Sequence, residues 1–316
     1  MKVLILGYSS IARRRVIPAL MHVDGVSGVQ IGSRSVIDLN KLEATIDATF
    51  VGYDLALANS DAEAVYISTV NSLHEQLVEK ALASGRHVMV DKPAFLELET
   101  AQRMVSIAAA KSLCLVEMTV FSYHPQFDSV RNLIARDGPV ERAVAIFSMP
   151  PFPADSYRYN MDLGGGALND LSPYAAATGR LFFSGAPHEA TCRVLTRHQS
   201  GADLSFSVLA NYGNGRSLMG TFGFDTEYRN SILALGPNLS LSLERAFSPP
   251  PDFKNRIKVR RANQPKTVFT TSGDSFVIAI QDFIDAIKSG DFTRFTKKLL
   301  IDAQARHTIS QSAVGV

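Results

Sequence analysis

A lysine at the end of an apolar strand is the residue of this chain best placed to do chemistry. The segment His87 to Asp91 reads HVMVD, and Lys92 and Pro93 follow it. A strand buried on both faces has no use for a cation, so Lys92 is expected where the carboxyl ends of parallel strands open to a ligand. Proline fixes its own φ, and the bond before it can be cis, so backbone geometry can set the direction of Lys92. An ordinary strand that ends in a surface lysine has the same pattern.

A second candidate segment contains three successive glycines followed by an acid and a phenol. It reads LGGGALNDLSPY and ends at Tyr174. Glycines let another backbone or a ligand come close. If the segment is helical, Asp170 and Tyr174 lie one turn apart on a single face. Two alternatives remain: Ser172 and Pro173 begin a later helix, or Asp170 only caps a helix and Tyr174 fills a core edge.

The first strand is followed by GYSSIA, which partly matches the dinucleotide fingerprint GxGxxG/A. Gly7 and Ala12 satisfy the first and third positions, and Ser9 replaces the second glycine. Backbone N–H groups at the start of the following helix can still receive a phosphate, which makes Gly7, Ser9, Ser10 and Ile11 candidate cofactor contacts. A plain strand-to-helix turn is the alternative.

The end of the second strand carries Ser33 and Arg34. Enzymes that prefer NAD place an acid near this point, whereas an arginine accommodates the 2′-phosphate of NADP. The pair therefore favours NADP(H), with NAD(H) as the alternative. A solvated arginine in a turn would have the same sequence.

The elements that position these residues alternate in type along the first third of the chain. Expected strands are Lys2 to Gly7, Val29 to Ser33, Ala64 to Thr69, His87 to Asp91 and Leu113 to Met118. Expected helices are Ile11 to His22, Leu73 to Ser84 and Leu98 to Lys111. This order predicts a doubly wound parallel sheet. Ser72 and Glu75 match a capping box, and Gly85 a helix C-cap.

The pattern changes from about Phe121. One more helix is expected near Pro125 to Arg136, and two closing helices near Ser275 to Lys288 and Phe295 to Ser312. Alternating strands are expected at Leu204 to Asn211, Ser217 to Phe224, Ser231 to Leu235 and Leu239 to Leu243. We predict a dinucleotide-binding Rossmann domain over 1–120 and an α+β substrate-binding and oligomerisation domain over 121–316, built on a large, mostly antiparallel sheet. The last helix can pack back on the first domain.

Composition excludes several classes. The chain has 316 residues, 46% of them hydrophobic and 20% charged, and a formal net charge of +2, so nucleic acid is not an expected partner. Cys114 and Cys192 are the only cysteines and have no metal-ligand spacing, which predicts no metal site and fits a reducing cytoplasm. No apolar segment approaches the length that spans a membrane.

Three segments in order resemble the Gfo/Idh/MocA oxidoreductases. They are GYSSIARRRVIPAL, STVNSLHEQLVEKALASGRHVMVDKP and DLGGGALNDLSPY. The family's hallmarks are a dinucleotide fingerprint, a TPNxxH segment, an EKP motif and a GGGxLxDxGxH segment. The resemblance runs in register to about Ser184 and more loosely beyond it. Its opening, together with PPFPADSYRYNMDLGGGAL, is most similar to the NADPH-dependent 3-ketoreductases of nucleotide-linked deoxysugars.

The resemblance implies a role for each matched residue. Lys92 would be the active-site lysine, Asp170 the acid of the third motif, and Tyr174 the proton-transferring residue where many members have histidine. The positions that it adds to the cofactor site are Thr69, Asn71, His74 and Asp91, together with Lys92. The departures from the family pattern are Ser9, Val70, Asp91, Ser172 and Pro173.

The implied reaction is hydride transfer between nicotinamide and a carbon of a sugar or sugar nucleotide. The oxygen that becomes an alkoxide needs a proton donor and a nearby cation, which Tyr174 and Lys92 would supply. Arg158, Tyr159 and Asn169 are candidate substrate contacts, although surface residues in a Pro-rich loop would read alike. Two alternatives are a cyclitol or free-sugar dehydrogenase and a non-catalytic NADP-binding regulator. An open sheet face also predicts a homodimer or homotetramer.

Overall fold

The computed structural model describes residues 1–37 and 46–315, and it divides into two compact units. Unit 1 consists of Met1–Met118 and Phe276–Leu300, and unit 2 of Thr119–Ser275 and Ile301–Val316. Each unit has its own sheet, so two cores carry the fold. Unit 1 is built from two separate stretches of the chain.

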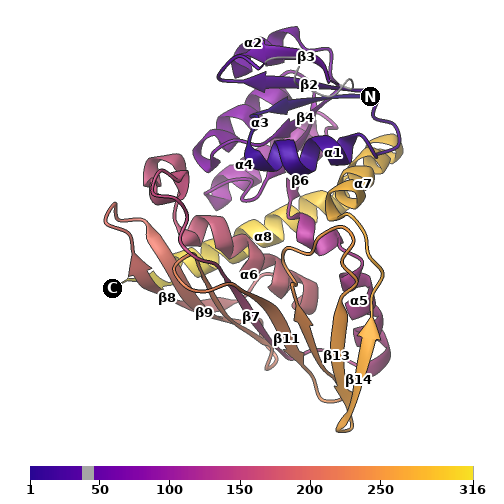
Figure 1. The fold of residues 1–316 in the computed structure, drawn as a ribbon, viewed down its shortest axis with the longest axis vertical. Helices are drawn as coiled ribbons and strands as arrows, with labels where there is room; N and C mark the ends of the chain where they lie inside the picture. Colours follow the sequence, from indigo (N-terminus) through magenta and orange to yellow (C-terminus); the bar gives the residue numbers. More distant parts are fainter. Residues whose placement is uncertain (38–45, 316) are drawn as a thin grey trace. The chain divides into compact units, whose positions relative to one another are not determined.

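Unit 1 contains a six-stranded sheet in the order β3-β2-β1-β4-β5-β6, with all neighbours parallel (Figure 1). Its strands are β1 Lys2–Leu6, β2 Gly28–Ser33, β3 Ile46–Val51, β4 Ala64–Ile67, β5 His87–Asp91 and β6 Leu115–Met118. The chain starts in the middle and winds outward in both directions, so the carboxyl ends of β1 and β4 flank the switch point where such sheets bind ligands. The predicted doubly wound parallel sheet is confirmed.

Helices cover both faces of this sheet. The helical elements of unit 1 are the π-helix η1 Ala12–Val16, α1 Ile17–Leu20, α2 Tyr53–Asn59, the 3-10 turn η3 Asn71–Leu73, α3 His74–Ala83, α4 Leu98–Ala110, α7 Ser275–Ser289 and the start of α8 Thr293–Gln311. Helices α2, α3 and α4 adjoin one another on one face. On the other face, α7 lies beside the first helix, where Arg15 stacks on Phe276 at 4.8 Å. Right-handed crossovers produce this division.

One predicted cap is wrong. The side chain of Ser72 does not cap α3, because a 3-10 turn precedes the helix and places Leu73 at its N-cap. Glu75 instead pairs with Arg103 on α4 at 2.5 Å. Gly85 does follow the helix with a positive φ of 76°, as a C-terminal glycine should.

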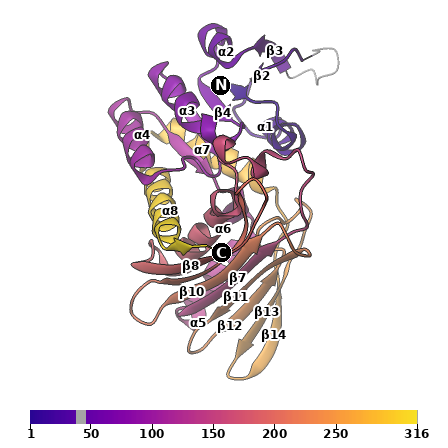
Figure 2. The same cartoon turned by 90° about the vertical axis from the view of Figure 1, so that its left-hand side faces the viewer.

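Unit 2 contains a nine-stranded sheet in the order β14-β13-β12-β11-β7-β10-β9-β8-β15 (Figure 2). Its strands are β7 Arg142–Ser148, β8 Glu189–Arg197, β9 Asp203–Asn211, β10 Ser217–Gly223, β11 Arg229–Leu235, β12 Ser240–Glu244, β13 Arg256–Arg261, β14 Gln264–Phe269 and β15 Ala313–Val314. All neighbours are antiparallel except β10 with β7 and β15 with β8. The mostly antiparallel sheet is confirmed.

Helix α6 Ala167–Phe183 lies across the middle strands of this sheet. The other helical elements of unit 2 are the 3-10 turns η4 Val120–Tyr123, η5 Tyr157–Tyr159 and η6 Met161–Leu163, the helix α5 Gln126–Asp137 and the end of α8. Buried alanines on α6 allow a close approach to strands β7, β9 and β10. Arg180 on α6 is anchored to Asp302 on α8 through two bonds of 2.7 and 3.0 Å.

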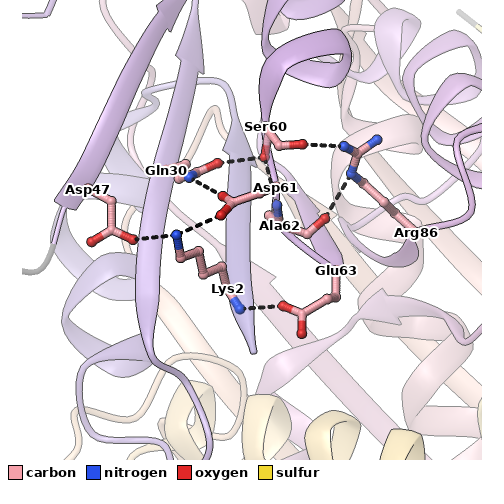
Figure 3. Close-up of polar contacts among 8 residues, drawn as sticks. All are labelled: Lys2, Gln30, Asp47, Ser60, Asp61, Ala62, Glu63 and Arg86. Carbon is pink, nitrogen blue, oxygen red and sulfur yellow. Dashed lines mark hydrogen bonds and ion pairs between the residues drawn. The ribbon is translucent and has the colours of Figure 1, made fainter.

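A polar network ties the amino ends of the strands in unit 1 together (Figure 3). Lys2 lies 2.7 Å from a carboxylate oxygen of Asp61, and the amide of Gln30 donates to the other oxygen at 2.6 Å. The hydrogen bond from Lys2 is the main cause that lowers the pKa of Asp61, and the bond from Gln30 adds to it. The network lies at the amino ends of the strands, whereas nucleotides bind at the carboxyl ends.

Asp61→Asn is expected to weaken the dependence of stability on acid pH. A carboxylate whose folded pKa is lowered stabilises the fold above its ordinary pKa of 3.8, and this contribution disappears as the pH falls below that value. Because the Asp61 side chain is 64% exposed, the effect is expected to be small. Thermal unfolding followed between neutral pH and about pH 3 measures it, with Asp252→Asn in an exposed loop as the control. The same acid-induced loss in Asp61→Asn and wild type would contradict the expectation.

Candidate functional site

Gly7 makes the turn that leads from β1 into the first helix. Its φ is +101°, and a Cβ there would lie 2.1 Å from the carbonyl oxygen of Ser68 on the neighbouring strand end. Its N–H donates to the Gly32 carbonyl at 2.9 Å. A side chain is therefore excluded at Gly7 by both φ and space, as the first position of a dinucleotide fingerprint requires.

Ser9 occupies the second fingerprint position with its hydroxyl already engaged. The hydroxyl accepts from the N–H of Ala12 at 3.0 Å and shares a hydrogen bond of 2.7 Å with Ser68. It thereby caps the first helical turn, while Ser10 and Ile11 beside it are exposed. The helix that follows is wound as a π-helix over Ala12–Val16, a distortion that is frequent at functional sites.

The serine network continues to the lysine strand. Ser68 donates to Asp91 at 2.6 Å, and Tyr66 donates to the other carboxylate oxygen at 2.7 Å. Burial raises the pKa of Asp91, and these two hydroxyls and the charge of Lys92 oppose the shift. A continuous chain of hydrogen bonds therefore joins Ser9 in the fingerprint to Asp91, the residue before Lys92.

Lys92 follows β5 directly, and the bond between Lys92 and Pro93 is cis. The lysine is half-buried at the carboxyl edge of the sheet. His74 lies beneath this turn, fully buried, with its Nδ1 2.8 Å from the Pro93 carbonyl and its Nε2 3.3 Å from the Thr69 carbonyl. Burial lowers the pKa of His74. His74 thus holds the Thr69 and Pro93 loops side by side, and Asn71 is buried next to it.

The end of β2 carries the two residues expected to read the ribose. Ser33 is buried and its hydroxyl donates to the Ser35 carbonyl, while Arg34 is exposed. Arg34 is close enough to Tyr53 on α2 to influence its titration: burial raises the pKa of Tyr53, and the arginine charge opposes it. The sequence does not predict Tyr53 as a neighbour of Arg34, because it predicts neither β3 nor α2.

In unit 2, Asp170 and Tyr174 lie on one helix. Helix α6 runs from Ala167 to Phe183 with Pro173 inside it, so the interpretation in which a later helix begins at Ser172 is wrong. Asp170 is in the first turn and Tyr174 one turn further on, on the same side. The helix is capped by Asp203, whose carboxylate accepts from the Leu168 N–H at 2.5 Å.

The three glycines before α6 pack against the backbone of the Pro-rich loop. A Cβ at Gly165 would lie 2.6 Å from the carbonyl oxygens of both Arg158 and Asn160. The N–H of Gly166 donates to the Arg158 carbonyl at 2.8 Å. The glycines therefore press the loop that carries Arg158 against the first turn of α6.

Arg158 and Asp170 meet as a partly buried ion pair. The Nε of Arg158 donates to Asp170 at 2.7 Å, and the side chains are 26% and 7% exposed. The guanidinium also stacks on the rings of Phe152 at 4.3 Å and Tyr157 at 4.8 Å. This pairing was not expected, because the sequence offered Arg158 only as a substrate contact or a surface residue.

Tyr174 is packed among aromatic rings. The ring centroids of Phe147, Phe247 and Phe121 lie 4.8, 5.4 and 5.6 Å from that of Tyr174.

The candidate substrate contact Tyr159 is buried and stacks on His198, with 4.4 Å between the ring centroids. Its hydroxyl donates to the Phe152 carbonyl.

Asn169 donates to the Gly165 carbonyl at 2.9 Å, so its amide is engaged by the glycine segment that precedes α6.

The structure brings Arg158, Asp170 and Tyr174 together in unit 2. In unit 1 it joins Ser9, Asp91 and the turn at Lys92.

Two kinds of feature are absent from the described part of the chain. Among residues 1–37 and 46–315, no three or more His, Cys, Asp or Glu side chains are grouped to hold a metal ion. Within the same ranges, no helix has the length and apolar character needed to cross a membrane.

Comparison with known proteins finds two matching domain families. A family described as "Oxidoreductase family, NAD-binding Rossmann fold" matches residues 1–119, and the "GFO/IDH/MocA C-terminal domain" matches residues 128–242. The dTDP-3,4-didehydro-2,6-dideoxy-alpha-D-glucose 3-reductase of Saccharopolyspora spinosa is 31% identical over 90% of this chain and 87% of that protein. The reductase of the same name from Streptomyces violaceoruber is 32% identical over 89% and 84%.

Solved structures agree with these matches. KijD10, a 3-ketoreductase from Actinomadura kijaniata in complex with NADP and TDP-benzene, superimposes with a TM-score of 0.93 at 26% identity, covering 100% of this chain and 98% of that one. The aldose-aldose oxidoreductase of Caulobacter crescentus has the same fold, with a TM-score of 0.87 at 18% identity over 99% and 97% of the two chains.

Proposed function

The chain belongs to the Gfo/Idh/MocA oxidoreductase family, and we propose that it uses NADPH to reduce the 3-keto group of a dTDP-linked deoxysugar. The observation that carries this proposal is the match over 90% of the chain to a reductase of that substrate. The protein is an NAD(P)-dependent oxidoreductase of sugar-like substrates. The exact sugar, its nucleotide and the carbon that reacts are the parts that we propose.

The residues of unit 1 fit a nicotinamide dinucleotide. Gly7 has no room for a side chain, and the backbone at Ser9, Ser10 and Ile11 opens a helix that can receive the pyrophosphate. Arg34, exposed at the end of β2, would neutralise a 2′-phosphate, which supports NADPH over NADH. The cofactor, when bound, supplies the hydride that reduces the carbonyl.

The chain's own residues then manage charge and protons. As the carbonyl is reduced, its oxygen becomes negative, and the Tyr174 hydroxyl gives its proton to that oxygen. The O–H bond of Tyr174 breaks, one forms on the sugar, and the phenolate is reprotonated from solvent. Lys92 contributes positive charge to the same step, which lowers the cost of forming both the alkoxide and the phenolate.

The test uses the full chain and a matched set of substrates. NADPH fluorescence on mixing measures binding, and loss of NADPH absorbance measures turnover after addition of a dTDP-linked 3-keto-deoxysugar. We expect turnover with the dTDP-linked sugar and little with the same sugar lacking dTDP. Faster oxidation of free aldoses or cyclitols with NADP would support a dehydrogenase instead, and binding without turnover of any keto sugar would support a regulator.

We also propose that the protein assembles as a homodimer or homotetramer in the cytoplasm. The sheet face opposite α6 carries a row of directly paired apolar side chains across four strands, Leu209, Met219, Val144 and Leu233. Three of these side chains are exposed in the single chain: Leu209 at 49%, Met219 at 48% and Leu233 at 37%. A row of exposed apolar side chains is typical of a face that a second copy of the chain covers. Sedimentation should give two or four times the 34.4 kDa mass of the chain, and a monomer would contradict this.

A further inference from the structure

We propose that the Arg158–Asp170 ion pair is an electrostatic device that tunes proton release by Tyr174, with Arg158 acting as a positioning residue rather than as a substrate contact. The proposal rests on the proposed role of Tyr174 as proton donor. It concerns residues of unit 2 alone. In this proposal, the charges of Asp170 and Arg158 both act on Tyr174.

The geometry places the ion pair beside the phenol. Asp170 and Tyr174 are one turn apart on α6, and Arg158 reaches that same side of the helix from η5 to bond Asp170 at 2.7 Å. The guanidinium carbon also lies 4.3 Å from the ring centroid of Phe152 and 4.8 Å from that of Tyr157. Because one carboxylate and two aromatic rings contact it, the Arg158 side chain has little freedom to move to a passing substrate.

Tyr174 is also one of the groups that influence the pKa of Arg158. Burial lowers the pKa of Arg158, but the charges of Asp170, Tyr157 and Tyr174 outweigh it, so the pKa is raised overall. A Coulomb interaction is mutual, so the same field that stabilises the guanidinium stabilises the phenolate of Tyr174. Tyrosine is a better proton donor when its phenolate costs less to form.

The aromatic rings around Tyr174 in unit 2 strengthen the effect of a nearby charge on its phenolate. The rings of Phe121 on η4, Phe147 on β7 and Phe247 after β12 pack against it, and none of them titrates. Arg158 from η5 and Asp170 from α6 are charged groups of this unit that lie near Tyr174. Tyr174 is only partly exposed, so water screens nearby charges less than it would at an open surface.

The two members of the pair act on Tyr174 with opposite signs. Removal of Arg158 leaves the Asp170 carboxylate one turn away, which disfavours the phenolate, so the pKa of Tyr174 should rise in Arg158→Gln. Removal of the carboxylate in Asp170→Asn leaves the cation uncompensated, so the pKa of Tyr174 should fall. The double variant should return close to wild type, because both charges are gone.

The experiment is an NMR titration of protein labelled at the ring Cζ of tyrosine, without cofactor or substrate. The Tyr174 signal is assigned by its loss in Tyr174→Phe, and Arg131→Gln on the exposed face of α5 is the control for loss of an arginine paired with an acid. Opposite shifts in the two single variants support the proposal. Identical titration in all variants, or shifts of one sign, would overturn it. This readout does not depend on which sugar the enzyme uses.

Kinetics separate tuning from substrate binding. Arg158→Gln is expected to lower kcat on the order of tenfold and to move its pH profile, with little change in KM, because each unit of pKa corresponds to a factor of ten in the phenolate equilibrium. Arg158→Lys, which keeps the charge, should recover part of kcat. A large rise in KM at constant kcat would show instead that Arg158 binds the substrate. Should Arg158→Gln fail to fold, the Asp170→Asn and Arg158→Lys titrations still decide the sign.

Discussion

Lys92→Met is expected to lower turnover on the order of 1,000-fold or more while leaving NADPH binding nearly unchanged. The side chain emerges from the carboxyl end of β5, where an open α/β sheet places its chemistry. Methionine keeps much of the length and apolar character of lysine and removes only the charge that stabilises the developing alkoxide. Loss of NADPH absorbance with the dTDP-linked keto sugar measures turnover, and fluorescence titration measures binding.

Lys111→Met is the matched control for this variant, because Lys111 is exposed at the C-terminus of α4, in the same unit. It should retain wild-type kinetics. Full activity of Lys92→Met would remove the lysine from the mechanism. A parallel loss of NADPH binding would indicate that Lys92 holds the cofactor rather than acting on the reaction.

Tyr174→Phe is expected to slow the reaction by a factor on the order of 100 or more. The substitution keeps the ring that packs against Phe121, Phe147 and Phe247 and removes only the hydroxyl that donates the proton. Stability should change little for the same reason. The loss should appear in kcat and kcat/KM alike, because the proton is transferred in the transition state and not on binding.

Tyr228→Phe provides the comparison, since Tyr228 lies in the same unit and is 48% exposed. Its kinetics should match wild type. Undiminished activity in both Tyr174→Phe and Lys92→Met would rule out the proton relay. The enzyme would then use other groups to transfer the proton. A loss confined to KM would make Tyr174 a substrate ligand.

The sequence predicted those elements whose hydrophobic pattern is regular. Strands β1, β4 and β5 are continuous apolar runs that are largely buried, and β9 and β10 mix buried and more exposed positions, so the sequence locates each strand to within about two residues. Strand β3 was missed, because as an edge strand with the sequence IDATFV it is only partly buried and shows neither pattern. Helix α2 was missed as well: it has only seven residues and two buried positions.

The candidate site likewise combines local features, which the sequence predicts, with contacts between distant residues, which it does not. Gly7 and Asp170 lie where motif spacing placed them, because a required turn and a helical repeat are local properties. The partners of these motifs are not local: Ser68 joins Ser9 to Asp91, Asp203 caps α6, and Arg158 pairs with Asp170. Nothing in the spacing of one motif shows which distant side chain the fold will bring to it.

The construction of unit 1 from two stretches of chain has a consequence for anyone who wishes to isolate it. A gene truncated after Met118 would omit α7, whose Phe283 lies against the ring of His87 and whose Gln281 accepts from the Asp24 N–H at 2.8 Å. The shortened product would expose the apolar side of the sheet and aggregate. A nucleotide-binding half that folds by itself would require a gene in which the codons for 276–300 are fused to those for the first segment.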